Sequence, residues 1–158
     1  MTEKYLKALE FATQKHKGQF RKGGLDYITH PIAVANILKE KGYGEEEQIV
    51  GLFHDLLEDT DATEEQILAL GGERVLTAVK LLTKTKGYQM SEYIAGIKSD
   101  PLAKMVKAAD RLHNLRCAVV CSKEFKMRYL KESKEWYADF GDEILDAITV
   151  LEQSLKND

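Results

Sequence analysis

The sequence has few cysteines and no long apolar run. Its two cysteines, Cys117 and Cys121, do not form a CxxC pair, so neither a disulfide framework nor a thiolate zinc site is expected. No apolar stretch is long enough to span a membrane, and no signal-peptide core follows Met1. These absences favour a soluble, cytoplasmic protein with reduced thiols and no membrane partner.

The sequence also lacks an excess of positive charge. The net charge of −3 argues against a nucleic-acid partner, because dedicated nucleic-acid binders are usually basic. It does not exclude a small anionic substrate, since a local basic patch or a bound cation can hold one. A chain of 158 residues suits one domain with a single core, so we expect residues 1–158 to form one domain.

Proline is scarce, and both prolines, Pro31 and Pro101, stand where a helix can begin. Apolar residues recur with helical spacing, and no segment keeps the alternation of a strand. The pattern therefore predicts an all-α protein, a single helical bundle. We expect helices at about 4–17, 30–41, 45–58, 64–71, 73–82, 88–98, 101–117 and 123–155, the last broken near Gly141.

The most informative stretch is residues 51–60, in which one histidine and three acidic residues interrupt an apolar helical pattern. If the predicted helix is continuous, the Asp55–Asp59 and His54–Glu58 pairs each share a face. Carboxylates this close repel one another unless a proton or cation lies among them. The stretch is therefore predicted to be part of a site.

Four residues form a candidate metal-ligand set: His30, His54, Asp55 and Asp110. Two imidazoles with two carboxylates suit Mn²⁺ or Fe²⁺, with Zn²⁺ and Mg²⁺ as alternatives. Each residue also has a simpler interpretation: His30 as a helix cap or core residue, and Asp110 as an ion-pair partner of a neighbouring cation. Their joint occurrence, with two further acids after the His-Asp pair, favours the metal.

Glu58 and Asp59 follow the proposed ligands by one turn. From that position they are predicted to orient a water molecule or exchange its proton. A bound divalent ion would make that water more acidic and polarise a phosphoryl oxygen. The residues alone thus indicate a metal site that could activate water next to a phosphoryl group.

Three blocks of the sequence give it a family resemblance: HKGQFR (16–21) with YITHP (27–31), FHDLLEDT (53–60) and ADRLHNLR (109–116). A weaker echo comes at Glu132-Ser133 and Tyr137-Ala138. In these blocks the chain resembles the HD-domain metal-dependent phosphohydrolases. It is most similar to the hydrolase half of bacterial alarmone (ppGpp) synthetase/hydrolases and to their small stand-alone relatives.

The resemblance implies one Mn²⁺ held by the four residues of the ligand set. It implies that Glu58 and Asp59 activate the water that attacks the 3′-pyrophosphate of ppGpp, giving GDP or GTP and pyrophosphate. Arg21 would pack on the guanine, with Lys22 beside it, while Asn114 would hold the sugar. Tyr137 would lie near the base.

The sequence departs from the family pattern mainly in the loop after Arg21, where the usual serine and proline are missing from residues 22–26. This change bears on base recognition more than on the metal set. Alternatives therefore remain: the same site acting on another nucleotide or phosphoester, a non-catalytic nucleotide sensor, and a metal-free helical interaction module. A homodimer is a further candidate assembly.

Overall fold

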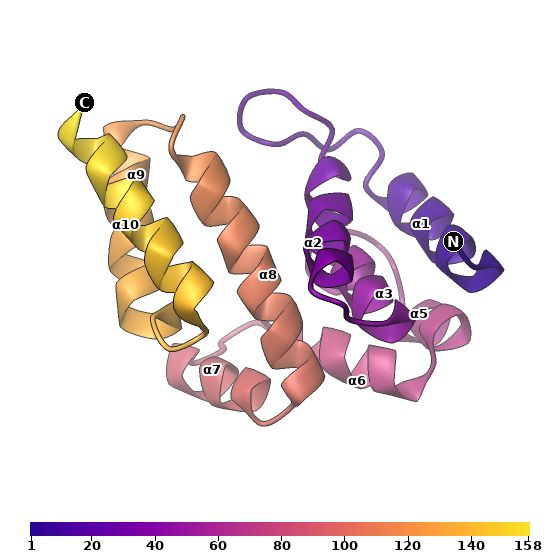
Figure 1. The fold of residues 1–158 in the computed structure, drawn as a ribbon. Coiled ribbons are helices and arrows are strands. Elements are labelled where there is room, and N and C mark those ends of the chain that lie inside the picture. The colour runs from indigo at the N-terminus through magenta and orange to yellow at the C-terminus, as the bar shows by residue number, and fades with distance from the viewer. The chain divides into compact units, whose positions relative to one another are not determined.

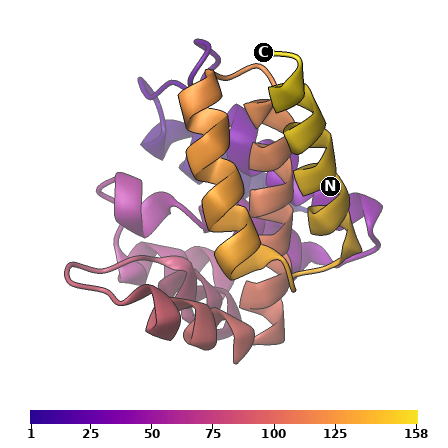
Figure 2. The same ribbon diagram turned by 90° about the vertical axis from the view of Figure 1, so that its left-hand side faces the viewer.

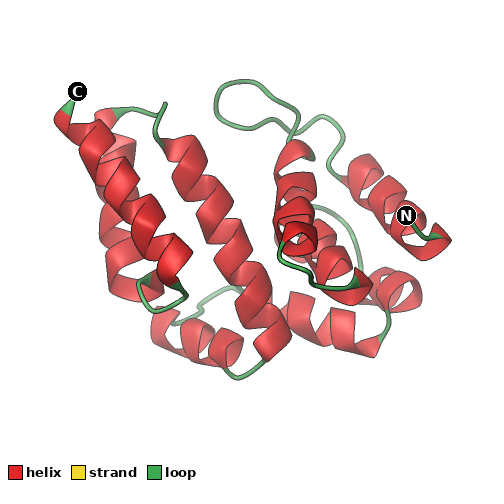
Figure 3. Cartoon of the chain, viewed as in Figure 1, coloured by secondary structure: helices red, strands yellow, loops and turns green.

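The computed structural model describes all 158 residues, and every named element in it is a helix (Figure 3). The only extended pairing is an isolated bridge between Phe20 and Asp26. The all-α prediction is therefore confirmed. The elements are α1 (Glu3–Lys15), α2 (Thr29–Glu40), α3 (Glu45–Phe53), α4 (Leu56–Asp59), α5 (Glu64–Gly71), α6 (Glu73–Leu82), α7 (Met90–Lys98), α8 (Pro101–Ala118), α9 (Lys123–Glu132), the π-helical η1 (Ser133–Tyr137) and α10 (Asp142–Lys156).

Three helices, α1, α5 and α9, follow a residue whose side chain accepts a hydrogen bond from a first-turn amide. Thr2 accepts a hydrogen bond from the Tyr5 amide at the start of α1, at 3.1 Å. Thr63 and Gln66 form a reciprocal capping box at the start of α5. Gly72 then ends α5 with φ +91°, a conformation that glycine adopts without steric cost. Local side chains and a glycine therefore define these helix ends.

The chain divides into two compact units, Met1–Lys107 and Ala108–Asp158, and the boundary falls within α8. In the first unit α3 is central and contacts α1, α2, α5 and α6 (Figure 1). A Cβ atom on Gly51 would lie 3.2 Å from the backbone nitrogen of Ala35, so glycine lets α2 and α3 approach closely. The expectation of one domain stays a prediction.

The predicted helix over residues 45–58 is interrupted in the structure, so this prediction is wrong in one respect. α3 ends at Phe53, His54 and Asp55 form a turn, and α4 begins at Leu56. The cause is local: His54 Nδ1 bonds the Gly51 carbonyl at 2.6 Å, and a continuous helix would offer that oxygen to the Asp55 amide. The Asp59 amide still bonds the Asp55 carbonyl at 3.0 Å, so Asp55 and Asp59 keep their one-turn spacing although the helix is interrupted.

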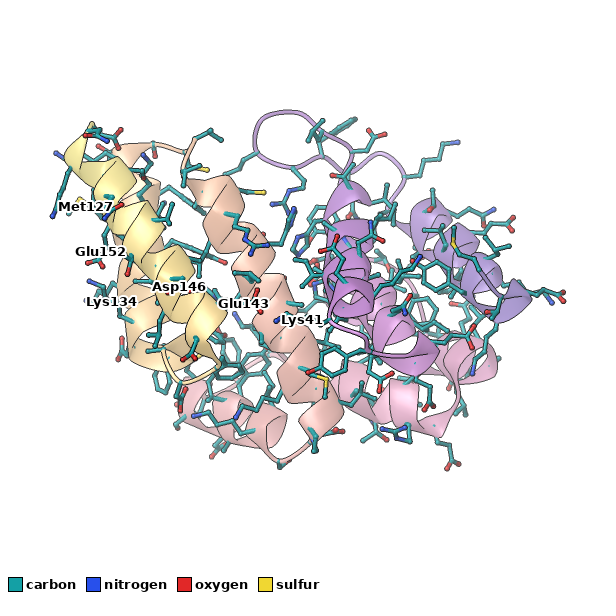
Figure 4. All side chains as sticks on the ribbon, viewed as in Figure 1. Lys41, Met127, Lys134, Glu143, Asp146 and Glu152 are labelled. Atoms are coloured by element: carbon teal, nitrogen blue, oxygen red, sulfur yellow. The ribbon has the colours of Figure 1, made fainter.

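In the second unit α9 and α10 lie side by side and run in opposite directions (Figure 2). The predicted break near Gly141 is confirmed, because Gly141 has φ +131° immediately before α10. The turn at η1 was not predicted. Lys134 on η1 reaches Glu152 on α10 in an exposed ion pair (Figure 4).

No helix of the structure is long and apolar enough to cross a membrane.

Candidate functional site

The first unit brings His30 and His54 together, as expected for two ligands from different helices. His30 lies in the first turn of α2 and His54 directly follows α3. Both are buried, their rings lie 5.3 Å apart between centroids, and ring nitrogens lie within 4.8 Å of one another. Two buried imidazoles this close are arranged to share one ligand.

The proton arrangement on His54 determines which of its nitrogens can act as a ligand atom. Nδ1 must donate to the Gly51 carbonyl, because a carbonyl oxygen can only accept. In the neutral ring Nε2 then has a lone pair, and it faces Asp55 Oδ2 at 3.1 Å. Two electron-rich atoms at that distance are stable only with a proton or a cation between them. The donor set therefore fits a metal ion, with the backbone carbonyl orienting the imidazole as in known metal sites.

Tyr27 belongs to a block that carries the family resemblance, but the sequence assigned it no role in the site. Its hydroxyl donates a hydrogen bond to the Asp55 carboxylate, and its ring lies 6.1 Å from that of His30. A tyrosine three residues before a histidine has no recognisable metal-binding pattern. The contact with Asp55 is made across 28 residues of sequence, so only the folded chain reveals it.

Glu58 and Asp59 lie at the end of α4, and both are exposed. The Glu58 carboxylate accepts a hydrogen bond from the Lys84 amide. Partial desolvation raises the pKa of Asp59, and the charges of Asp55 and Glu58 raise it further, while His16 and His54 act in the opposite sense. A carboxylate with a raised pKa binds a proton more readily than an ordinary aspartate.

Asp110 and Asn114 belong to the second unit, on α8. Asp110 is buried, and Asn114 Nδ2 lies 3.4 Å from its Oδ1. The simpler interpretation paired Asp110 with a nearby cation. Two cationic side chains on the same helix, Arg111 and Arg116, contact other carboxylates. Arg111 bonds Glu132 at 2.5 Å, and Arg116 lies 3.8 Å from Glu143.

Arg21 and Lys22 occupy the loop between α1 and α2. The Arg21 amide bonds the Leu25 carbonyl at 2.7 Å, which closes a tight turn through Gly23 and Gly24, both at φ +97°. Lys22 is exposed and Arg21 is half-buried. The loop thus has a defined turn despite its altered sequence.

Tyr137 lies on η1 and is completely buried. Its ring centroid is 4.0 Å from Arg111 Cζ, and the Phe140 ring packs against it at 5.2 Å. No ring surface is exposed to a nucleotide base in this conformation. A role for Tyr137 near the base stays a prediction.

Comparison with known proteins gives a family match and several long relatives. The HD domain family matches residues 8–143. Over 144 residues the chain is 40% identical to a guanosine-3′,5′-bis(diphosphate) 3′-pyrophosphohydrolase of Aquifex aeolicus, covering 86% of this chain and 21% of that protein. Over 152 residues it is 34% identical to a GTP pyrophosphokinase of Myxococcus xanthus, covering 87% and 20%. The chain therefore spans about a fifth of the length of these curated relatives.

A solved structure resembles the chain over nearly its whole length. It is described as "A metazoan ortholog of SpoT hydrolyzes ppGpp and plays a role in starvation responses". The TM-score is 0.72 at 27% sequence identity, with 99% of this chain and 94% of that chain covered. The two proteins share their fold.

Proposed function

Because the chain belongs to the HD domain family, we propose that it is a divalent-metal-dependent phosphohydrolase that removes the 3′-pyrophosphate of ppGpp. The observation that supports metal dependence most directly is the 3.1 Å approach of the His54 Nε2 lone pair to the Asp55 carboxylate. The names of the relatives and of the structural neighbour support the substrate.

In this proposal His30, His54 and Asp55 of the first unit and Asp110 of α8 hold the ion. Asp110 continues the helix face of Ala103 and Val106, which precede it by seven and four residues and are fully buried. Its carboxylate therefore emerges on a buried face of α8, as a ligand requires. The matching of the ADRLHNLR block to the family pattern supports the same assignment.

Mn²⁺ is the ion we favour, with Fe²⁺, Mg²⁺ and Zn²⁺ as alternatives, because two imidazoles and two carboxylates form a borderline-to-hard donor set. A bound divalent ion supplies Lewis acidity and lowers the pKa of a water molecule. Tyr27 holds the Asp55 carboxylate through its hydroxyl, so the position of this ligand is fixed before the ion arrives.

Glu58 and Asp59 are assigned to the attacking water. Glu58 is held by the Lys84 amide and orients the water, while Asp59 accepts its proton. The raised pKa of Asp59 makes it a stronger base than an ordinary aspartate. The water oxygen then bonds to phosphorus as the bond to the 3′-oxygen breaks, the departing 3′-oxygen takes up the proton that Asp59 accepted, and the products are GDP and pyrophosphate.

Substrate recognition is assigned to Arg21, Lys22, Asn114 and Tyr137. Arg21 offers a planar guanidinium suited to stacking on guanine, and Lys22 offers an exposed charge for a phosphate. Asn114 would hold the sugar, and Tyr137 reaches the base only if η1 rearranges, because its ring is buried. A cytoplasmic location fits the two free thiols.

The decisive experiment is incubation of the protein with ppGpp and Mn²⁺, following GDP and pyrophosphate. We expect turnover that is abolished by EDTA and reduced by about 10³-fold or more in Asp55→Ala, because several kcal/mol of transition-state stabilisation is lost. The matched control is Asp146→Ala, which removes an exposed aspartate on α10 (Figure 4) and should keep full activity. Equal activity in the Asp55 and Asp146 variants would contradict the proposal.

A second candidate is hydrolysis of a different nucleotide or phosphoester at the same site. The altered loop after Arg21 is the observation that favours it. A panel of nucleoside polyphosphates assayed with Mn²⁺ separates the candidates: turnover of another nucleotide but not ppGpp supports this one. Tight nucleotide binding without turnover of any member supports the non-catalytic sensor.

A further inference from the structure

His16 has features that a purely structural histidine does not need. It follows α1 and is 2% exposed, so both ring nitrogens are removed from solvent. Nδ1 lies 2.8 Å from Gln19 Oε1. Nε2 is buried without a hydrogen-bond partner in the protein. Buried polar atoms are nearly always satisfied, so an unsatisfied ring nitrogen needs an explanation.

The hydrogen bonds of Gln19 decide where the His16 proton lies. Gln19 Nε2 donates to the Asp59 carbonyl at 2.8 Å. The other amide atom, Oε1, can only accept, so His16 Nδ1 must be the donor. The neutral ring is then the Nδ1–H tautomer, and Nε2 has a lone pair.

A second contact links His16 to the metal-ligand carboxylate. The rings of His16 and Tyr27 lie 4.8 Å apart between centroids, and the Tyr27 hydroxyl donates to Asp55. His16 therefore packs against the residue that holds Asp55 and, through Gln19, bonds the backbone of Asp59. Asp55 immediately precedes α4, and Asp59 is its last residue.

We infer that His16 is a positioning residue of the site: as the Nδ1–H tautomer it holds Gln19 against the Asp59 carbonyl and thereby fixes Asp59 relative to Asp55. The inference rests on the proposed role of Asp59 in accepting the proton of the attacking water. With the proton on Nδ1, Nε2 of the neutral ring can only accept, and no donor of the protein faces it.

Four variants separate positioning from stability. His16→Asn keeps a donor in place of Nδ1, whereas His16→Phe keeps the ring packing but loses both nitrogens. Gln19→Leu removes the link to Asp59 from the other side. Ala12→Gly is the matched control, because it weakens α1 one turn earlier at a buried position without touching the hydrogen bonds.

We expect kcat for ppGpp to fall about tenfold to 100-fold in His16→Phe and in Gln19→Leu, the range expected for a misplaced catalytic group. In the double variant His16→Phe/Gln19→Leu, kcat should fall no further than in either single variant, because both substitutions break the same chain of hydrogen bonds. His16→Asn should retain most of the activity. Mn²⁺ affinity should be unchanged in all three, since no ligand is altered. Additive losses, or equal losses in His16→Asn and His16→Phe, would overturn the inference.

A second measurement does not depend on turnover. The ¹⁵N chemical shifts of His16 should report protonated Nδ1 and bare Nε2 in the wild type, and should change in Gln19→Leu. The opposite tautomer would overturn the inference even in an active enzyme. Lack of ppGpp hydrolysis with the expected tautomer would instead reject the proposed function. Loss of kcat in Ala12→Gly equal to that in His16→Phe would show that only helix stability matters, and would also overturn it.

Discussion

The two units of the chain bury polar side chains in opposite ways. In the second unit the buried cations Arg111 and Lys126 each bind a carboxylate, Glu132 at 2.5 Å and Asp158 at 2.9 Å. In the first unit the buried imidazole of His54 faces the Asp55 carboxylate with a lone pair. Burial of charge is stable when it is paired. The two buried cations of the second unit thus have carboxylate partners, whereas His54 and Asp55 of the first unit need a proton or a cation between them.

The surroundings of the buried groups sharpen this difference. Arg111 lies between two tyrosine rings, with its Cζ 4.4 Å from the Tyr129 centroid and 4.0 Å from that of Tyr137. Burial lowers the pKa of Arg111, but the neighbouring tyrosines and Glu132 outweigh it and hold that pKa above its usual value. A guanidinium held so firmly supports packing. The His54 imidazole instead presents Nε2 to the Asp55 carboxylate, an arrangement that suits a shared cation.

The largest effect on stability is expected from adding Mn²⁺, which should bind at His54 and Asp55 of the first unit. Mn²⁺ at about 100 times its Kd should raise the free energy of unfolding by about 2.7 kcal/mol, since the ion binds only the folded chain. Urea titrations with and without Mn²⁺ measure this difference. His54→Ala should remove the effect, whereas His113→Ala, at a half-buried histidine outside the ligand set, should keep it. An equal response in both variants would contradict the ligand assignment.

The next largest effect is expected from breaking the completed pair of the second unit. Glu132→Ala leaves the Arg111 guanidinium buried without its carboxylate and should lower the free energy of unfolding by about 2 kcal/mol, less than for a fully buried pair because Glu132 is half-exposed. The control is Glu152→Ala, which removes an exposed pair with Lys134 (Figure 4) and should cost less than about 1 kcal/mol. Chemical denaturation distinguishes the two. Indistinguishable losses would show that burial does not matter here.

A smaller effect is expected when the support of a ligand is removed. Tyr27→Phe keeps the ring but deletes the hydroxyl that bonds Asp55. Mn²⁺ affinity should weaken about tenfold, the low end of what such supporting groups contribute. Calorimetric titration measures it, with Tyr43→Phe as the control at a tyrosine in another loop. Unchanged affinity would mean that Asp55 needs no support.

The smallest effect concerns the pH dependence of stability at Asp59. Its folded-state pKa is raised above the ordinary value of 3.8, chiefly by desolvation and then by the charges of Asp55 and Glu58. An acid with a raised pKa favours the folded state when protonated, so this contribution is lost as pH rises through the folded pKa. Without metal, Asp59→Asn should therefore be more stable than wild type at pH 7, and the advantage should vanish below pH 3.8. Unfolding curves at both pH values test it, and an advantage independent of pH would contradict it.

Most of the helices could be predicted from sequence because their signals are local. Thr63 with Gln66 and the glycines before α6 and α10 are recognisable without tertiary contacts. The interruption at His54 could not be predicted in this way. It arises because a side chain takes a carbonyl that the helix would otherwise use, and hydrophobic spacing is the same with or without that exchange.

The same distinction between local and tertiary causes applies to the candidate site. Residue type and order along the chain suggested the candidate ligands, because two histidines and two aspartates followed by further acids favour a metal over the simpler interpretation of each residue. The tautomer of His54, the support of Asp55 by Tyr27 and the link from His16 to Asp59 were decided only by the tertiary structure. Each depends on a hydrogen bond between residues that only folding brings together. Residue types alone therefore do not specify which acceptor a given donor meets.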